Sequence, residues 1–238
     1  LLAGIDGNKD QSYFLCQLSQ EQLAKALFPI GGLRKPEVRE IAREQGLPTA
    51  EKKDSQGICF VGKIDLPVFL QQKLAAKQGN VVEIKQEFYD RLPKPDLNDL
   101  DALVKPYYYY ANNGKKIGVH NGAHFYTIGQ RKGIGVGGHT EPLFVIATDV
   151  ETNTLYVGEG HNHPGLNRKG LFIASNEVHW VRPDLMMNAG EERSYLVRVR
   201  YRQPLQNARL YMRENGLYIV FDEYQRGITA GQFAAWYD

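Results

Sequence analysis

Residues 208–221, Ala-Arg-Leu-Tyr-Met-Arg-Glu-Asn-Gly-Leu-Tyr-Ile-Val-Phe, decide how the last third of the chain folds. Two short runs rich in aliphatic and aromatic residues, 208–212 and 217–221, flank Asn215-Gly216. Asn-Gly between two such runs is a strong hairpin signal, because both residues accept the positive φ that a tight turn requires. Further short strands with regular turns around this hairpin predict a small β-barrel or sandwich.

The segment before the hairpin concentrates positive charge. Residues 195–202, Tyr-Leu-Val-Arg-Val-Arg-Tyr-Arg, alternate as a strand does, so we expect Arg198, Arg200 and Arg202 on one face. A solvated outer face explains such alternation. A row of arginines also suits a nucleic-acid phosphate backbone, and the residues alone leave both interpretations open.

The rest of the chain is mixed. Ser19 and Gln22 have the spacing of a capping box, Pro36 and Gly46 bracket a second short helix, and Asp65 can begin a third. Short extended runs predict strands at 81–85, 107–111, 115–119, 125–128 and 143–148, with an irregular segment at 92–106. The expected fold class is therefore α+β, mostly β, with a short helical N-terminal part, a mixed central domain and a C-terminal antiparallel β-barrel.

Three glycines, Gly133, Gly135 and Gly138, formally satisfy G-x-G-x-x-G. That dinucleotide fingerprint needs a helix after the glycines, because the helix N-terminus binds the pyrophosphate. Here an expected strand follows, so we reject a dinucleotide site. The neighbouring Gln130-Arg131-Lys132 is then either a basic RNA-facing loop or part of a tight β-connection.

Two other clusters suggest sites without deciding on one. The four residues Tyr107 to Tyr110 are either a base-stacking platform or mixed core and surface packing, since adjacent strand residues point to opposite faces. His161 and His163 lack a Cys or acidic partner at a recognisable ligand spacing. We therefore expect no metal site.

Composition narrows the class of protein. The 238 residues carry a net charge of only +2, so any nucleic-acid role depends on local clustering of charge. No apolar run approaches the roughly 20 residues of a membrane helix, and no signal peptide is recognisable. Two cysteines do not make a disulfide scaffold, which favours a reducing, cytoplasmic location. The absence of an initiator Met suggests a fragment or a processed chain.

One of the two cysteines, Cys59, lies in the segment 54–62, Asp-Ser-Gln-Gly-Ile-Cys-Phe-Val-Gly. Gly57 and Gly62 on either side of Cys59 and two lysines just before the segment suit a reachable thiolate, which is the reactive form of cysteine. Ile58-Cys59-Phe60 equally resembles a small buried hydrophobe in a strand. Local sequence leaves a reactive and a structural cysteine both open.

Several segments together resemble the tRNA-specific 2-thiouridylase family (MnmA/TrmU) and occur in the family's order over nearly the whole chain. They are Lys-Asp-Gln-Ser-Tyr-Phe-Leu at 9–15, Phe-Pro-Ile-Gly at 28–31, Lys-Asp-Ser-Gln-Gly-Ile-Cys-Phe at 53–60, Tyr-Thr-Ile-Gly-Gln-Arg-Lys-Gly at 126–133, Gly-His-Asn-His-Pro at 160–164, Arg-Tyr-Arg-Gln at 200–203 and Thr-Ala-Gly-Gln at 229–232.

The resemblance implies an enzyme that thiolates the wobble uridine (position 34) of tRNA. An N-terminal ATP-pyrophosphatase domain would use ATP, with Mg, to activate the C2 carbonyl. Cys59 would carry sulfur as a persulfide received from a sulfur-relay or cysteine desulfurase protein. A second cysteine of the N-terminal domain would release the sulfur and form a disulfide with the first. The same resemblance implies tRNA contacts at Lys9, Asp10, Gln11, Arg200, Tyr201 and Gln232.

The chain departs from the family pattern in ways that limit these expectations. The Ser-Gly-Gly-x-Asp-Ser pyrophosphate loop and the second catalytic cysteine are absent, and Cys16 is expected to be structural. The chain by itself is therefore expected neither to bind ATP nor to thiolate. The expected domains are 1–52, a remnant of the ATP-pyrophosphatase domain, 53–160, a central tRNA-binding domain with an apparent insertion at 87–119, and 161–238, the β-barrel.

Two alternatives and one conflict accompany this hypothesis. A non-catalytic RNA-binding module would make Cys59 a core residue, and a stand-alone thiol redox protein is disfavoured because no C-x-x-C is present. Arg200 and Tyr201 are neighbours on the expected strand and should point in opposite directions. Both can contact RNA only at a strand end, at a bulge or through the backbone.

Overall fold

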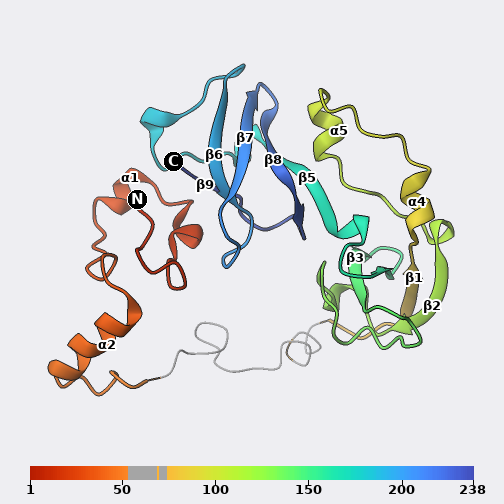
Figure 1. Ribbon diagram of the computed structural model, residues 1–238, viewed down its shortest axis with the longest axis horizontal. Coiled ribbons are helices and arrows are strands. Elements are labelled where there is room, and N and C mark those ends of the chain that lie inside the picture. The colour runs from red at the N-terminus through yellow and green to blue at the C-terminus, as the bar shows by residue number, and fades with distance from the viewer. Residues whose placement is uncertain (53–68, 70–73) are drawn as a thin grey trace. The chain divides into compact units, whose positions relative to one another are not determined.

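The computed structural model describes residues 1–52, 69 and 74–238 (Figure 1). The segment with Cys59 and the helix expected from Asp65 lie outside these residues, apart from Phe69. The chain divides into two compact units. Unit 1 comprises Leu1–Gln56, Phe172–Asp222 and Ala230–Asp238, and unit 2 comprises Gly57–Leu171 and Glu223–Thr229. The three-domain division expected from the sequence stays a prediction.

A five-stranded sheet, most of whose residues belong to unit 1, has the strand order β5-β8-β7-β6-β9. The strands are β5 (Asn167–Ala174), β6 (Glu192–Arg198), β7 (Gln206–Arg213), β8 (Gly216–Arg226) and β9 (Ala235–Tyr237). The pairs β6–β7, β6–β9 and β7–β8 are antiparallel. Alternating residues of these strands form the core of the unit, including the fully buried side chains of Val197, Leu210, Leu217, Ile219 and Phe221.

The hairpin predicted from residues 208–221 is confirmed. Arg213 pairs with Gly216, so Glu214 and Asn215 form the two-residue connection, one position earlier than the Asn-Gly pair suggests. Gly216 has a φ of 153°, and a Cβ there would overlap the carbonyl oxygen of Ile173. Glycine is therefore required at this position by close backbone approach as well as by conformation.

The expected strand over 195–202 is wrong at its second half, because β6 ends at Arg198. Residues 199–203 form bends and a turn, in which the Val199 amide donates to the Gln203 side chain at 3.0 Å and the Gln203 amide donates to the Arg200 carbonyl at 3.1 Å. The arginines consequently do not share a strand face. Arg198 is buried, whereas Arg202 is exposed in the turn.

The N-terminal segment of unit 1 is helical, as predicted. The elements are η1 (Ser12–Leu15), α1 (Gln20–Leu23) and α2 (Lys35–Glu44). The capping box of Ser19 and Gln22 is present, Pro36 lies in the first turn of α2, and Gly46 follows that helix with a φ of 63°. The Gln20 side chain donates to the carbonyl oxygen of Val181, which ties α1 to the chain before β6.

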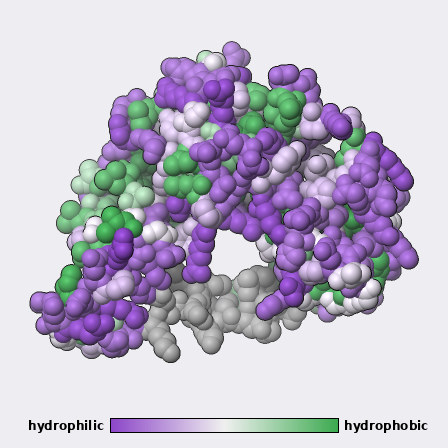
Figure 2. All heavy atoms as spheres, viewed as in Figure 1, coloured by the Kyte–Doolittle hydropathy of each residue, from purple (hydrophilic) through white to green (hydrophobic). Residues whose placement is uncertain are grey.

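Large apolar side chains remain exposed in this N-terminal segment. Leu27, Phe28 and Ile30 are 91%, 50% and 58% exposed. Figure 2 shows hydrophobic side chains gathered on this part of the surface, while most of the visible face is hydrophilic. Contiguous exposed apolar surface is typical of a protein interaction site.

Unit 2 is built on a four-stranded mixed sheet in the order β2-β1-β4-β3. The strands are β1 (Gly79–Glu83), β2 (Lys115–His120), β3 (Leu143–Asp149) and β4 (Thr154–Glu159). β1 and β4 run parallel, whereas β1–β2 and β3–β4 are antiparallel. Alternate residues of β1 enter two separate hydrophobic clusters, Val81 in one and Val82 in the other, so both faces of the sheet are covered.

Two predicted strands of unit 2 are wrong. Residues 107–110 have no regular structure and lead into η2 (Ala111–Asn113). Phe125 is the last residue of the short η3 (Ala123–Phe125), and 126–128 form no strand. Tyr109 is buried, and its hydroxyl lies 2.7 Å from that of Tyr89. The contact between these two tyrosines, 20 residues apart in the sequence, outweighs the strand propensity of residues 107–110.

The segment expected to be irregular, 92–106, contains the short helix α5 (Leu100–Val104), and another short helix, α4 (Gln86–Asp90), ends just before it. The Asp99 carboxylate caps α5 by accepting from the amides of Asp101 and Ala102. Among the described helices, none combines the length and apolarity needed to cross a membrane. The mostly β fold class predicted from the sequence is confirmed.

Candidate functional site

Unit 1 brings together three segments that are far apart in the sequence, namely 9–14, 198–203 and 232–237. Tyr13 joins all three, because its hydroxyl lies 3.2 Å from the carbonyl oxygen of Val199 and 2.9 Å from that of Phe233. The Tyr13 ring is 5% exposed and packs edge-on against Phe233. All six residues expected to contact tRNA lie in these three segments.

The Asp10 carboxylate organises the first segment from within. It accepts hydrogen bonds from the Gly4 amide (3.1 Å), the Ser12 amide (3.0 Å) and the Ser12 hydroxyl (2.8 Å). Burial alone would raise the pKa of Asp10, but these hydrogen bonds and the charge of Arg198 lower it overall. Asp10 is 6% exposed, and its carboxylate binds groups of the protein itself. Its side chain therefore positions the neighbouring residues and offers little surface to a ligand.

Arg198 links the same carboxylate to the end of β6. Its Nη1 lies 3.6 Å from Asp10 Oδ2 and 3.4 Å from the carbonyl oxygen of Tyr201, to which it donates. The guanidinium also lies over the Tyr237 ring, 5.0 Å from its centre, and the Tyr237 hydroxyl is 3.0 Å from Ser12 Oγ. Arg198 therefore holds the 199–203 turn against both the N-terminal segment and β9.

Basic, amide and aromatic side chains lie on the surface where the three segments meet. Lys9, Gln11 and Gln232 are exposed, and Arg200 and Tyr201 are half-buried. Because β6 ends before Arg200 and Tyr201, the conflict expected from strand alternation does not arise. We call this surface, formed by Lys9, Gln11, Phe14, Arg200, Tyr201 and Gln232, the convergent surface.

Phe14 and Arg198 belong to this arrangement and were not recognised as site residues from the sequence. The Phe14 ring is 51% exposed and lies 4.8 Å from the Tyr201 ring, at an interplanar angle of 38°. Phe14 stands inside the segment 9–15 that suggested the family, which was a usable signal. Strand alternation predicts Arg198 as one of a row of arginines on one face, whereas the structure buries it in contact with Asp10.

Of the two cysteines, only Cys16 lies among the described residues. Cys59, the expected persulfide carrier, lies outside the described residues. Cys16 is half-buried, and burial raises the pKa of its thiol. A raised pKa disfavours the thiolate, which agrees with the structural role expected for Cys16.

The glycine segment of unit 2 is a tight connection with exposed charge. Gly133, Gly135 and Gly138 all have positive φ, and the next regular element is the strand β3, so the helix required by a dinucleotide site is missing here. The Gln130 side chain accepts from the Thr127 amide and donates to the Lys132 carbonyl, which closes the turn. Arg131 and Lys132 are exposed, so this loop also presents two positive charges.

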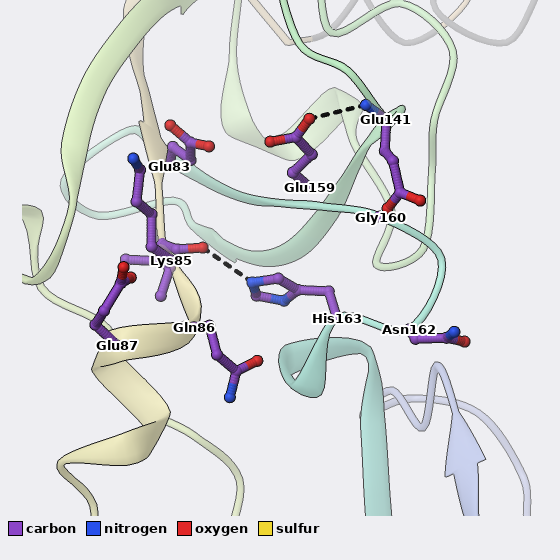
Figure 3. A pocket seen from close by; sticks show the side chains of 10 residues that line it. Glu83, Lys85, Gln86, Glu87, Glu141, Glu159, Gly160, Asn162 and His163 are labelled. Atoms are coloured by element: carbon purple, nitrogen blue, oxygen red, sulfur yellow. Dashed lines mark hydrogen bonds between the residues drawn. The ribbon is translucent and has the colours of Figure 1, made fainter.

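A pocket of about 400 Å³ opens on another part of unit 2 (Figure 3). His163 lines it but is already engaged: Nδ1 accepts from the Gly165 amide, which leaves the proton on Nε2 to donate to the Ile84 carbonyl at 2.9 Å. Burial lowers the pKa of His163, and the neutral ring fits this pattern. The other residues that line the pocket include four glutamates, Glu83, Glu87, Glu141 and Glu159.

Three family models match the chain in order. They are described as the tRNA methyl transferase HUP domain (residues 1–63), the tRNA methyl transferase PRC-barrel domain (residues 107–159) and the aminomethyltransferase beta-barrel domain (residues 171–238).

Curated relatives match the chain over its whole length. The proteins named tRNA-specific 2-thiouridylase MnmA from Christiangramia forsetii and Flavobacterium johnsoniae are 57% and 58% identical over 100% of this chain and 61% of their own length. The protein of the same name from Karelsulcia muelleri is 46% identical over 100% of this chain and 60% of its own. The chain thus spans about three fifths of the length of these relatives, and it belongs to the tRNA-specific 2-thiouridylase (MnmA) family.

Proposed function

We propose that this chain forms the tRNA-holding and sulfur-carrying part of an enzyme that replaces the C2 oxygen of the wobble uridine of tRNA with sulfur. The observation that carries the proposal is the identity of 57–58% over the entire chain to proteins named tRNA-specific 2-thiouridylase. The low cysteine content supports a reducing, cytoplasmic setting for this chemistry.

ATP, with Mg, would supply the activation of the C2 oxygen as a leaving group in the complete enzyme. The residues of this chain do not fit an ATP site. The sequence has no Ser-Gly-Gly-x-Asp-Ser loop, and residues 1–52 contain only η1, α1 and α2 as regular elements. We therefore assign no step of the activation to side chains of this chain. The match to the HUP domain over residues 1–63 supports ATP use by the complete protein.

The convergent surface is proposed to hold the tRNA. Lys9 and Arg200 supply positive charge for phosphate oxygens, and Gln11 and Gln232 supply amide donors and acceptors. Tyr201 and Phe14 offer adjoining ring faces on which an unstacked base can lie, as single-stranded RNA requires. Asp10 acts as a positioning residue, because it and Arg198 fix the relative placement of the segments that carry these groups.

Cys59 is proposed to carry the sulfur as a persulfide delivered by a sulfur-relay or cysteine desulfurase protein. The thiolate of a second cysteine of the complete enzyme would attack the inner persulfide sulfur, Cys59 Sγ, and break its bond to the outer sulfur. The two cysteines would then form a disulfide, and the outer sulfur would leave as hydrosulfide, which would attack the adenylated C2 and displace AMP. Sulfur attack on an activated carbon needs a soft nucleophile held close to it, which the hydrosulfide released from a cysteine persulfide would provide. The flanking glycines at 57 and 62 support a loop that can reach both partners.

A thiolation assay tests this function against the alternative of a non-catalytic RNA-binding module. The chain, completed with the part of the HUP domain found in its longer relatives, is incubated with ATP, a persulfide donor and unmodified tRNA. Mass spectrometry of the nucleosides then measures 2-thiouridine. Accumulation of 2-thiouridine that requires ATP supports the enzyme. Tight tRNA binding without any 2-thiouridine would favour the module.

A further inference from the structure

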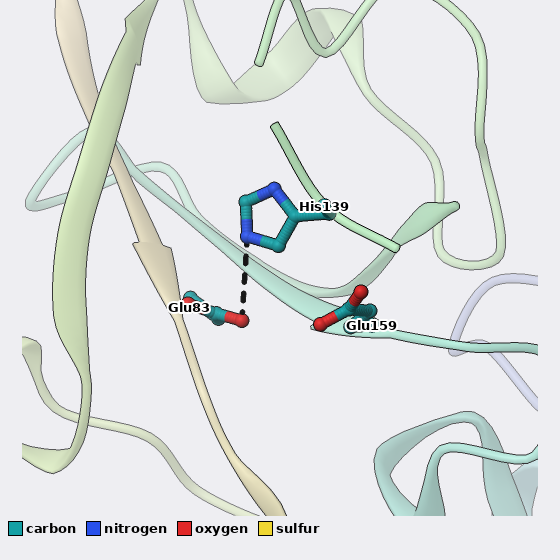
Figure 4. A group of neighbouring side chains, drawn as sticks. All are labelled: Glu83, His139 and Glu159. Atoms are coloured by element: carbon teal, nitrogen blue, oxygen red, sulfur yellow. Dashed lines mark ion pairs between the residues drawn. The ribbon is translucent and has the colours of Figure 1, made fainter. Parts of the chain in front are cut away.

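Two glutamates meet at the carboxyl ends of the parallel strands β1 and β4 in unit 2 (Figure 4). Glu83 pairs with Val157, and Glu159 follows Val157 by two residues, so both glutamates lie on the same face of the sheet. The glycine segment ends at His139, whose ring points toward the two carboxylates in Figure 4. The topology thus gathers one imidazole and two carboxylates from three parts of the chain.

The three side chains are close enough to share one ion. One nitrogen or oxygen atom from each lies within 4.8 Å of the others, and His139 Nε2 is 3.4 Å from Glu83 Oε1. Ligand atoms that share one ion at about 2.1–2.2 Å lie roughly 3–4.4 Å apart, so the side chains would have to move closer by rotation to bind an ion. Glu159 is already oriented, because its Oε1 accepts from the Glu141 amide at 2.8 Å.

The Glu83 carboxylate provides an independent reason to expect a cation. Glu83 is 6% exposed, yet no hydrogen bond reaches its carboxylate from any of the described residues, and His139 is its only ion-pair partner among them. Glu83 lines the pocket, so its carboxylate is held in a largely protein environment in which an opposite charge in the pocket would stabilise it. One contact at 3.4 Å is weak compensation for such a group.

The surrounding pocket has an excess of negative charge. Besides Glu83 and Glu159, it is lined by Glu87 and Glu141, and among the described residues that line it Lys85 is the one lysine or arginine. The charge of Lys85 acts on Glu159, where it helps to lower the pKa of that carboxyl, but one lysine does not balance four glutamates. The pocket therefore favours a mobile cation, and its exposed lining residues Glu87 and Glu141 give water access to complete a coordination shell.

We propose that Glu83, His139 and Glu159 bind one divalent metal ion of the Mn²⁺ type. Carboxylate oxygens with a single imidazole suit such an ion, and no thiolate is present in the set to favour softer metals. The bound ion would neutralise the meeting carboxylates and anchor the end of the 129–139 glycine segment to the sheet. This site is separate from the residues proposed for thiolation and does not rest on that proposal.

Mn²⁺ itself is the probe that tests the site. The protein is freed of metals with EDTA and titrated with MnCl₂, while the electron paramagnetic resonance signal measures free Mn²⁺ and thermal unfolding is followed in parallel. We expect one Mn²⁺ per chain, a higher unfolding temperature in its presence, and at least tenfold weaker binding in Glu159→Gln and in His139→Gln. Glu159 is only partly buried, so its variant is the one expected to fold normally.

Glu87→Gln is the matched control, because Glu87 lines the same pocket but is exposed and outside the set of three. Its affinity for Mn²⁺ should equal that of the wild type. Equal weakening in Glu87→Gln and Glu159→Gln would mean diffuse attraction to an acidic pocket and would overturn the proposal. Absence of stoichiometric binding by the wild-type protein would overturn it as well.

Discussion

The Asp10 carboxylate and the Arg198 guanidinium form a buried ion pair, 3.6 Å between Oδ2 and Nη1, that joins the N-terminal segment to the end of β6. Both residues are less than a tenth exposed. Removing one partner of a buried pair leaves an uncompensated charge and is strongly destabilising. The pair should therefore stabilise unit 1 and set the geometry of the convergent surface.

Replacing Asp10 by Asn should lower the free energy of unfolding by about 3 kcal/mol, because Arg198 keeps its burial and loses its counter-charge. Both tryptophans, Trp180 and Trp236, lie in unit 1 with their rings 5.1 Å apart, so tryptophan fluorescence during urea unfolding reports on this unit. Asp184→Asn, which removes an exposed partner of Arg182, is the control and should cost less than about 1 kcal/mol. Equal losses in the two variants would contradict a stabilising role for the buried pair.

The same pair predicts a pH dependence. The pKa of Asp10 is lowered below its usual 3.8 in the folded protein, so its contribution to stability is complete above the unfolded pKa and is lost as pH falls through the folded pKa. The stability difference between the wild type and Asp10→Asn should therefore be constant near neutral pH and shrink below about pH 4. Urea unfolding at a series of pH values measures it. A difference that persists unchanged into stronger acid would show that Asp10 acts through packing rather than through its charge.

Phe14 should contribute to tRNA affinity through stacking. Phe14→Leu keeps an apolar side chain against Tyr13 and Tyr201 but removes the aromatic face, and one lost stacking contact is worth about 1–3 kcal/mol. We expect tRNA affinity to fall by at least about fivefold, with no change in its salt dependence. Phe172→Leu removes a similarly exposed ring that lies on Tyr218, away from the convergent surface, and should leave affinity unchanged.

Cys59 and Cys16 offer a matched pair of substitutions for the sulfur chemistry. In the completed enzyme, Cys59→Ser should abolish 2-thiouridine formation and leave tRNA binding intact, because a serine cannot carry a persulfide. Cys16→Ser should retain activity, since the raised pKa of the Cys16 thiol disfavours its reactive form. Mass spectrometry of tRNA nucleosides gives the readout. Normal thiolation by the Cys59 variant would remove that residue from the mechanism.

Local signals in the sequence predicted the elements that depend on neighbouring residues. The capping box of Ser19 and Gln22, the left-handed Gly46 and the hairpin at 208–221 are each decided by a few adjacent side chains, and all three are present. The tyrosines at 107–110 were misread as a strand because Tyr109 packs against Tyr89, a contact outside any local window.

The candidate site was predictable only in part, because contacts between residues far apart in the sequence complete it. The family segments identified Lys9, Gln11, Arg200, Tyr201 and Gln232, and the structure places these residues in segments that Tyr13 joins. The burial of Asp10 and Arg198 follows from a contact between distant parts of the chain, which alternation along β6 could not reveal. The meeting of Glu83, His139 and Glu159 likewise depends on the parallel pairing of β1 with β4.

The salt dependence of tRNA binding tests the central claim, that the convergent surface holds the RNA, most directly. Affinity is measured over a series of KCl concentrations for the wild type, Lys9→Gln, Arg200→Gln and Arg213→Gln. Arg213 is the matched control, because it pairs with Glu192 on β6 and lies outside the convergent surface. Lys9→Gln and Arg200→Gln should each reduce the slope of log affinity against log salt by about 0.7–0.9, the effect of one lost phosphate contact, and Arg213→Gln should not. Unchanged slopes for Lys9→Gln and Arg200→Gln would contradict the account.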